Sequence, residues 1–268
     1  FLMTSPLFGM KHGCYVFDDG EQQVYAMFQN AHGTAYSEFG VPSAASVENL
    51  KKIIPEDELF PIERTESWIY HHAFGAWGEQ RWLCLDVVRK YFGEPACIAD
   101  VVDATQWMQC EGYKAIFEEA RRQWPYCSMA INWCFNEPWI TAANNALFTY
   151  PAEKKPAYWS VRDSLRNSIP SARIPKFDWS AGEEFSFSLW YLNDAPEAVS
   201  DTVRATIRIG SEEIPLATWE TGEIPACTNK QGETIRVILP QCSDTRELLL
   251  TLESANGNTS TYTLLYRG

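Results

Sequence analysis

A mostly apolar stretch in the middle of the chain reads Cys127-Ser128-Met129-Ala130-Ile131-Asn132-Trp133-Cys134-Phe135. It follows a segment with helical periodicity at residues 98–124. An apolar run of this length after a helix is typical of a strand that is buried on both faces of a parallel sheet. Further helices are predicted at residues 82–92, ended by Gly93, and from Pro156 onward. This alternation of strands and helices predicts an α/β fold, either a (β/α) barrel or an open parallel sheet.

The pattern changes after the prolines at positions 170 and 175. Apolar residues then alternate with polar ones, as in Phe185, Phe187 and Leu189, and Asn256-Gly257 marks a turn. About six or seven short strands in such a segment predict a β-sandwich. We therefore expect two domains, residues 1–172 with α/β structure and residues 173–268 with all-β structure.

Composition excludes several classes of partner. The chain has 268 residues and a net charge of −13, which disfavours nucleic acid because acidic surfaces repel phosphates. No stretch approaches the roughly 20 apolar residues of a membrane span, so no membrane partner is expected. The 11 Trp, 12 Tyr and 14 Phe suit a core, and also stacking on sugar rings. Because the chain starts at Phe1, without an initiator Met, we interpret it as an internal piece of a longer protein.

No cofactor or metal is predicted. The 8 cysteines have irregular spacing and form no zinc-binding pattern with histidines. There is also no glycine-rich phosphate loop and no Gly-x-Ser-x-Gly motif, which disfavours nucleotide-dependent and serine-hydrolase chemistry.

Two acidic residues stand at the carboxyl ends of predicted strands, where α/β barrels place their active sites. One is Glu38, in Ala35-Tyr36-Ser37-Glu38-Phe39-Gly40, and the other is Glu137, in Asn136-Glu137-Pro138-Trp139. Glu38 is either a desolvated catalytic carboxylate or a solvated residue at a strand end. Asn-Glu-Pro resembles the acid/base motif of retaining glycosidases. In those enzymes the acid/base motif precedes the nucleophile strand, whereas in this chain Asn136-Glu137-Pro138 follows Glu38.

The order of these motifs resembles the β-mannosidase branch of glycoside hydrolase family two. The segment 35–43 is similar to the nucleophile strand, strand seven of a (β/α)8 barrel, and Tyr91-Phe92-Gly93-Glu94-Pro95 is similar to the segment that follows it. The segment 131–139 resembles the strand-eight motif, with Glu137 in place of an aspartate. Lys155-Pro156-Ala157-Tyr158-Trp159 resembles the start of the last barrel helix.

The resemblance implies a fold and a set of roles. The fold is the C-terminal half of a (β/α)8 TIM barrel followed by an Ig-like β-sandwich, with Met3–Pro6 at the end of strand five and residues 12–19 near strand six. Glu38 would be the nucleophile of a retaining exo-β-glycosidase, and the acid/base would lie upstream, outside the chain. The sugar would be bound by four residues, Trp133, Asn136, Glu137 and Trp139.

Alternatives remain open at this point. The fragment would be inactive alone, and a non-catalytic carbohydrate-binding or structural module on a degenerate barrel is the competing hypothesis. Separately, core packing is the alternative to a sugar-binding role for Trp133 and Trp139. Self-association is one way to cover the open sheet edge that half a barrel leaves. The substrate is predicted to be a β-mannoside-like glycoside, and the location periplasmic or extracellular if the longer protein is exported.

Overall fold

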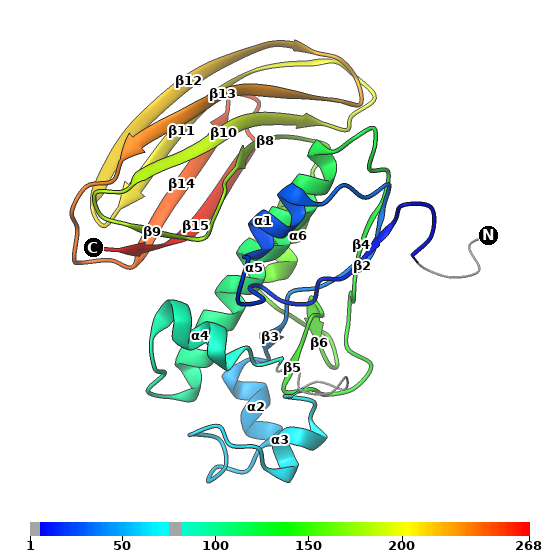
Figure 1. Cartoon of the computed structure of the whole chain (residues 1–268), viewed down its shortest axis with the longest axis vertical. Coiled ribbons are helices and arrows are strands. Elements are labelled where there is room, and N and C mark those ends of the chain that lie inside the picture. Colours follow the sequence, from blue (N-terminus) through cyan, green and yellow to red (C-terminus); the bar gives the residue numbers. More distant parts are fainter. Residues whose placement is uncertain (1–5, 75–81) are drawn as a thin grey trace. The chain divides into compact units, whose positions relative to one another are not determined.

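The structure, a computed structural model, describes residues 6–74 and 82–268 (Figure 1). The predicted strand-five end at Met3–Pro6 therefore lies outside the described residues, except for Pro6. The chain divides into two compact units. The first unit comprises Phe1–Val24, Gly33–Tyr113 and Met129–Val161, and the second comprises Tyr25–His32, Lys114–Ser128 and Arg162–Gly268.

The first unit contains a three-stranded parallel sheet in the order β1-β2-β4. These strands are β1 (Lys11–His12), β2 (Tyr36–Phe39) and β4 (Ala130–Asn132). Parallel neighbours need crossover connections, and here helices supply them. Helix α1 (Val24–Asn30) lies between β1 and β2 in the chain, and α5 (Ile98–Arg122) is the last helix between β2 and β4. The predicted alternation of strands and helices is therefore present.

The remaining elements of the first unit are short. Two antiparallel pairs join β3 (Ser43–Ala44) to β5 (Ala143–Asn144) and β6 (Phe148–Thr149) to β7 (Glu153–Lys154). The other helices are α2 (Val47–Ile53), α3 (Glu66–Tyr70), α4 (Leu85–Phe92) and α6 (Ala157–Ser164). A buried core is formed by residues of these elements, of α5 and of the loops between them, including Leu50, Trp68, Leu83 and Val101.

Helix ends follow the predicted signals closely. Helix α4 ends at Phe92, and Gly93 adopts a positive φ of 86°, which a glycine tolerates without strain. Helix α5 starts at Ile98, as predicted, and ends at Arg122, two residues before the predicted limit. Helix α4 begins three residues later than predicted, at Leu85 instead of Trp82.

The prediction of a strand buried on both faces at residues 127–135 is wrong. Only Ala130–Asn132 is a strand, and Ile131 within it is 49% exposed. Among the described strands, β4 pairs with β2 alone and so lies at an edge of its sheet. An apolar run records hydrophobicity but not the number of neighbouring strands, so it cannot distinguish an edge strand from a central one.

The second unit contains two sheets, with strand orders β13-β10-β8 and β12-β11-β14-β15-β9. All pairings are antiparallel except that of β15 with β9. The predicted alternation on β10 is confirmed, because Phe185, Phe187 and Leu189 are all buried. The strands are β8 (Ser168–Arg173), β9 (Asp178–Ser180), β10 (Glu184–Asn193), β11 (Val199–Ile209), β12 (Glu212–Ile224), β13 (Thr228–Ile238), β14 (Glu247–Ser254) and β15 (Thr259–Arg267).

A buried polar cluster connects the end of α5 to these sheets. The carboxylate of Glu118 accepts hydrogen bonds from Tyr262 Oη at 2.8 Å and from Arg122 at 3.2 Å. Arg122 also donates to the carbonyl of Ala172 at 3.0 Å. Strand β8 starts at Ser168, before the predicted boundary between residues 172 and 173. The division into 1–172 and 173–268 stays a prediction about independent folding.

Candidate active site

Glu38 lies near the carboxyl end of β2, where parallel strands present loops and side chains to one edge. Its neighbours Tyr36 and Phe39 are buried, whereas the side chain of Glu38 is 22% exposed. The backbone is held on both sides, because the Gly13 amide donates to the Glu38 carbonyl at 2.8 Å. At Gly40 a side-chain carbon would overlap Asn145, so the motif needs a glycine there.

Two residues from the β1 region converge on the Glu38 carboxylate. His12 Nε2 lies 2.8 Å from Glu38 Oε1, and the hydroxyl of Tyr15 donates a hydrogen bond to the same oxygen. The Tyr15 hydroxyl also lies 3.2 Å from His12 Nε2. Strand pairing causes this convergence, since His12 is the register partner of Glu38 in the sheet. We call these three residues the Glu38 cluster.

The Tyr15 hydroxyl remains a hydrogen-bond donor in this cluster. Burial, and then the neighbouring Glu38 carboxylate, raise the pKa of Tyr15 above its usual range. A hydroxyl that keeps its proton remains available to donate its hydrogen bond to the Glu38 carboxylate. The cluster therefore orients this carboxylate, as a nucleophile or an electrostatic stabiliser requires.

Trp133 is the predicted sugar-binding residue that lies beside this cluster. Its amide donates to the Phe39 carbonyl at 2.7 Å, which continues the pairing of β4 with β2 beyond Asn132. Its ring meets Tyr15 edge-on, with centroids 6.3 Å apart, and the residue is 42% exposed. A half-exposed indole next to a carboxylate supplies an apolar wall of the kind that binds a sugar ring.

Glu137 has a different environment. Its side chain has no exposed surface, and Oε1 lies 3.7 Å from the ammonium of Lys155, which is also buried. The other carboxylate oxygen accepts a hydrogen bond from the Tyr150 amide at 3.3 Å. The Glu137 carboxylate is thus buried and contacts both the Lys155 ammonium and the Tyr150 amide, and its binding of a sugar hydroxyl stays a prediction.

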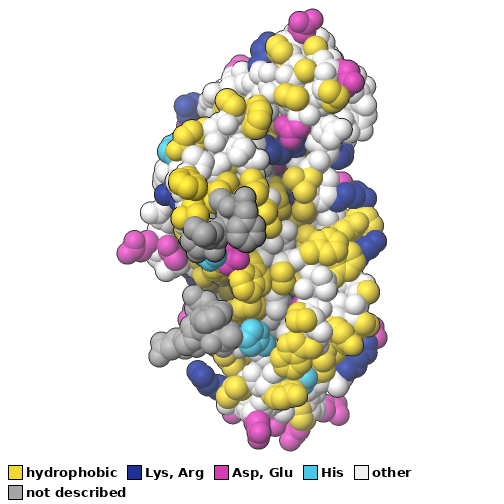
Figure 2. Space-filling model, turned by 90° about the vertical axis from the view of Figure 1, so that its right-hand side faces the viewer, with side chains coloured by type: hydrophobic (Ala, Val, Ile, Leu, Met, Phe, Trp, Pro, Cys, Tyr) yellow, Lys and Arg dark blue, Asp and Glu magenta, His cyan; other side chains and the backbone are white. Residues whose placement is uncertain are grey.

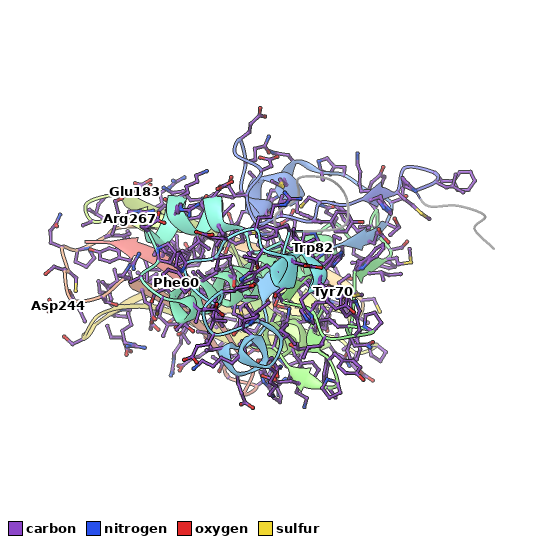
Figure 3. The ribbon with its side chains drawn as sticks, turned by 90° about the horizontal axis from the view of Figure 1, so that it is seen from below. Phe60, Tyr70, Trp82, Glu183, Asp244 and Arg267 are labelled. Carbon is purple, nitrogen blue, oxygen red and sulfur yellow. The ribbon has the colours of Figure 1, made fainter. Side chains whose placement is uncertain are left out.

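Trp139 and Asn136 flank this buried acid. Trp139, 37% exposed, stacks on the His71 ring with centroids 5.7 Å apart, and Tyr70 meets it edge-on. The exposed Asn136 donates from Nδ2 to the Glu137 carbonyl at 3.3 Å. Figure 3 labels Tyr70, at the end of α3. The structure thus joins Glu38 to Trp133 through Tyr15, whereas Trp139 belongs to a second aromatic group with His71.

Exposed aromatic residues extend beyond these two groups. Figure 2 shows hydrophobic side chains in several patches, with histidine side chains among them, on the face turned toward the viewer. The exposed apolar residues of the first unit include Ile131, Phe135, Tyr150 and Trp159. Large exposed aromatic groups are typical of surfaces that bind a ligand or a partner.

His12 and Tyr15 were not predicted as site residues. Strand β1 is only two residues long, which is too short to show the alternating pattern that predicts a strand. The signal that was present is positional, because the resemblance placed residues 12–19 near the strand that precedes the Glu38 strand. Parallel pairing of these neighbouring strands then brings His12 opposite Glu38.

Neither a metal site nor a membrane-spanning helix is found in the part of the chain that the structure describes. Within residues 6–74 and 82–268, no three side chains from His, Cys, Asp and Glu gather as metal ligands would. No helix in these same ranges combines the length and the apolar character that crossing a membrane requires.

Comparison with known proteins connects this geometry to glycosidases. No protein-family model matches the sequence. A β-mannosidase B from Thermothelomyces thermophilus is 25% identical over 151 residues, which are 54% of this chain and 18% of that protein. The chain resembles part of a β-mannosidase-like glycoside hydrolase. The resemblance predicted from the sequence motifs is therefore confirmed.

Solved structures of related fold agree with this conclusion. A β-D-mannosidase from Dictyoglomus thermophilum superposes with a TM-score of 0.70 at 17% identity, covering 96% of this chain and 30% of its own. An exo-chitosanase from Amycolatopsis orientalis superposes with a TM-score of 0.65 at 18% identity, covering 94% of this chain and 30% of its own. These similarities show a shared fold, and the chain spans less than a third of each relative's length.

Proposed function

We propose that this β-mannosidase-like chain is the part of a retaining exo-β-glycosidase that supplies the nucleophile, Glu38. The observation that supports the proposal best is the Glu38 cluster, in which His12 and Tyr15 contact the Glu38 carboxylate near a strand end. Strands β1, β2 and β4 would be consecutive strands of a (β/α)8 barrel, because they are parallel neighbours in one sheet and their order in the sheet follows their order in the chain. The second unit would be the Ig-like domain that follows the barrel.

The chemistry would proceed in two steps. Glu38 would attack the anomeric carbon of the terminal sugar and form a covalent glycosyl–enzyme ester, while a second carboxyl group protonates the leaving oxygen. That second group would then deprotonate a water molecule, which attacks the same carbon and releases Glu38. Retaining enzymes hold the two carboxyl groups about 5 Å apart. We propose that this partner comes from outside the 268 residues, so the chain alone would be inactive.

The sugar would lie against Trp133, with the segment that carries Asn136, Glu137 and Trp139 providing further contacts. A half-exposed indole beside the nucleophile matches the apolar wall of a sugar subsite. The names of the relatives include a β-mannosidase and an exo-chitosanase, so the substrate is proposed to be a terminal β-linked hexose. A β-mannoside is the first substrate to test.

A non-catalytic carbohydrate-binding role is the second candidate, favoured by the exposed tryptophans. A mechanism-based fluorinated β-mannoside distinguishes the two in a longer protein that contains this chain. We expect covalent labelling of the peptide that carries Ser37-Glu38-Phe39. Labelling of the peptide around Glu137 would assign the nucleophile to the other acid. Reversible binding without any label, together with no turnover of aryl β-glycosides, would establish the non-catalytic role.

A further inference from the structure

Lys155 is a buried cation that joins three separate segments of the first unit. Its ammonium donates hydrogen bonds to the carbonyls of Ser43 on β3, at 3.2 Å, and Asn144 on β5, at 2.9 Å. It also forms the ion pair with Glu137 in the segment that follows β4. A single side chain thus connects β3, β5 and the segment that carries Asn136 and Trp139.

Glu137 depends on this cation. Its Oε1 atom is buried and has no hydrogen-bond partner among the described residues, so the nearby positive charge of Lys155 is its compensation. A buried carboxylate that loses its counter-ion is strongly destabilised until it reaches water or takes up a proton. The neutral amine would still be able to donate to the two carbonyls, but it would leave the Glu137 charge uncompensated.

We propose that Lys155 is a positioning residue whose charged ammonium keeps Glu137 buried and holds the segment 136–139 in place, and that neutralising the ammonium releases this segment. Trp139 would move with it, since the tryptophan lies two residues after Glu137. The consequence for sugar binding rests on the proposed function, whereas the movement itself does not.

The groups around Lys155 place this transition in the alkaline range. Burial lowers the pKa of Lys155 to about 8, and the Glu137 carboxylate and the Cys134 thiol oppose the decrease. The other groups that contact the ammonium are the carbonyls of Ser43 and Asn144, which do not titrate. Burial and then Glu137 raise the pKa of the Cys134 thiol, so its ionisation falls above that of an ordinary thiol.

The experiment follows Trp139 directly by ¹⁹F NMR of the chain labelled with 5-fluorotryptophan, with the signal assigned through Trp139→Phe. The titration starts at pH 7.5, above the ordinary histidine pKa of about 6.5, because His71 stacks on this ring. We expect the Trp139 signal to shift with a midpoint near pH 8. Lys155→Arg should keep the low-pH signal throughout, because an arginine stays charged.

Three further variants complete the test. Lys155→Met should give the released signal at every pH, and Cys134→Ser should titrate like the original chain. Lys154→Met, which removes the adjacent exposed lysine, is the matched control and should also titrate normally. A Trp139 signal that stays fixed from pH 7.5 to 9.5, or one that moves equally in Lys155→Arg, would overturn the proposal. Both decisive results come from the original chain and from Lys155→Arg, which keep a basic residue at position 155, so they do not depend on the folding of Lys155→Met.

Discussion

His12 Nε2 lies 2.8 Å from Glu38 Oε1, across the register of two parallel strands. Tyr15 donates to the same oxygen, so two hydrogen-bonding side chains act on a single carboxylate oxygen. This convergence fixes the rotamer of Glu38 more firmly than a solvated residue at a strand end would be fixed. The arrangement gives the proposed nucleophile a defined orientation before substrate binds.

Tyr15→Phe is expected to lower turnover of an aryl β-glycoside by about 10- to 100-fold in the longer protein, because a hydrogen bond to a charged group contributes about 1.5–3 kcal/mol. The loss should fall on kcat, with KM little changed, because the hydrogen bond orients the attacking carboxylate. Steady-state kinetics measures both constants. Tyr126→Phe, at an exposed tyrosine of the second unit, is the control and should change neither property.

Glu38→Gln and Glu137→Gln separate the roles proposed for the two acids. In the longer protein Glu38→Gln should reduce kcat by about a thousandfold or more while the fold is kept, because an amide is not a competent nucleophile. Glu137→Gln should mainly raise KM, since the proposed contact to a sugar hydroxyl would exist in both the ground state and the transition state. Steady-state kinetics and circular dichroism measure both. A fall in kcat for Glu137→Gln as deep as that for Glu38→Gln, rescued by azide, would make Glu137 a catalytic carboxylate.

Asp18 should contribute stability that acid removes. Burial would raise its pKa, but the hydrogen bonds from Lys90 and Tyr91 outweigh burial and hold the pKa of Asp18 below its ordinary value. A depressed carboxylate pKa stabilises the folded state above the unfolded pKa of about 3.9, and this contribution is lost as the pH falls through the folded value.

Asp18→Asn is therefore expected to lower the melting temperature at pH 7 and to have much less effect near pH 2.5. Thermal unfolding at the two pH values measures the difference. Asp19→Asn is the matched control, because the neighbouring Asp19 is exposed and accepts hydrogen bonds from the local backbone amides of Glu21 and Gln22. An equal loss of stability at both pH values would show that Asp18 acts through packing and not through its charge.

The β-domain is predicted to fold without the first unit. A protein of residues 174–268 should give dispersed amide signals, because its strands carry their own alternating core positions. A protein of residues 162–268 should melt at a higher temperature, since it keeps β8, which pairs with β10 over six residue pairs. Thermal unfolding compares the two proteins. A collapsed, undispersed spectrum for residues 174–268 would show that the predicted boundary is not a domain boundary.

The end of α4 and the inward-facing residues of β10 could be predicted because both depend on local chemistry. Gly93 ends α4 with a positive φ that suits a glycine, although its ψ of −172° lies outside the predicted left-handed helical region, and Phe185 and Phe187 point inward because side chains alternate along a strand. The position of Glu38 at the end of a strand followed from the same kind of local pattern. These features need information from only a few neighbouring residues.

The tertiary structure decided what surrounds the acids and which strands have neighbours. Pairing of β1 with β2 brings His12 and Tyr15 to Glu38, and the return of the chain to Lys155 buries Glu137. The exposure of Ile131 likewise depends on which distant residues cover the faces of β4. Sequence determined the periodic pattern and the residue types, because these are properties of neighbouring positions. Charge compensation and burial were decided by contacts between residues that are distant in the chain, which periodicity does not record.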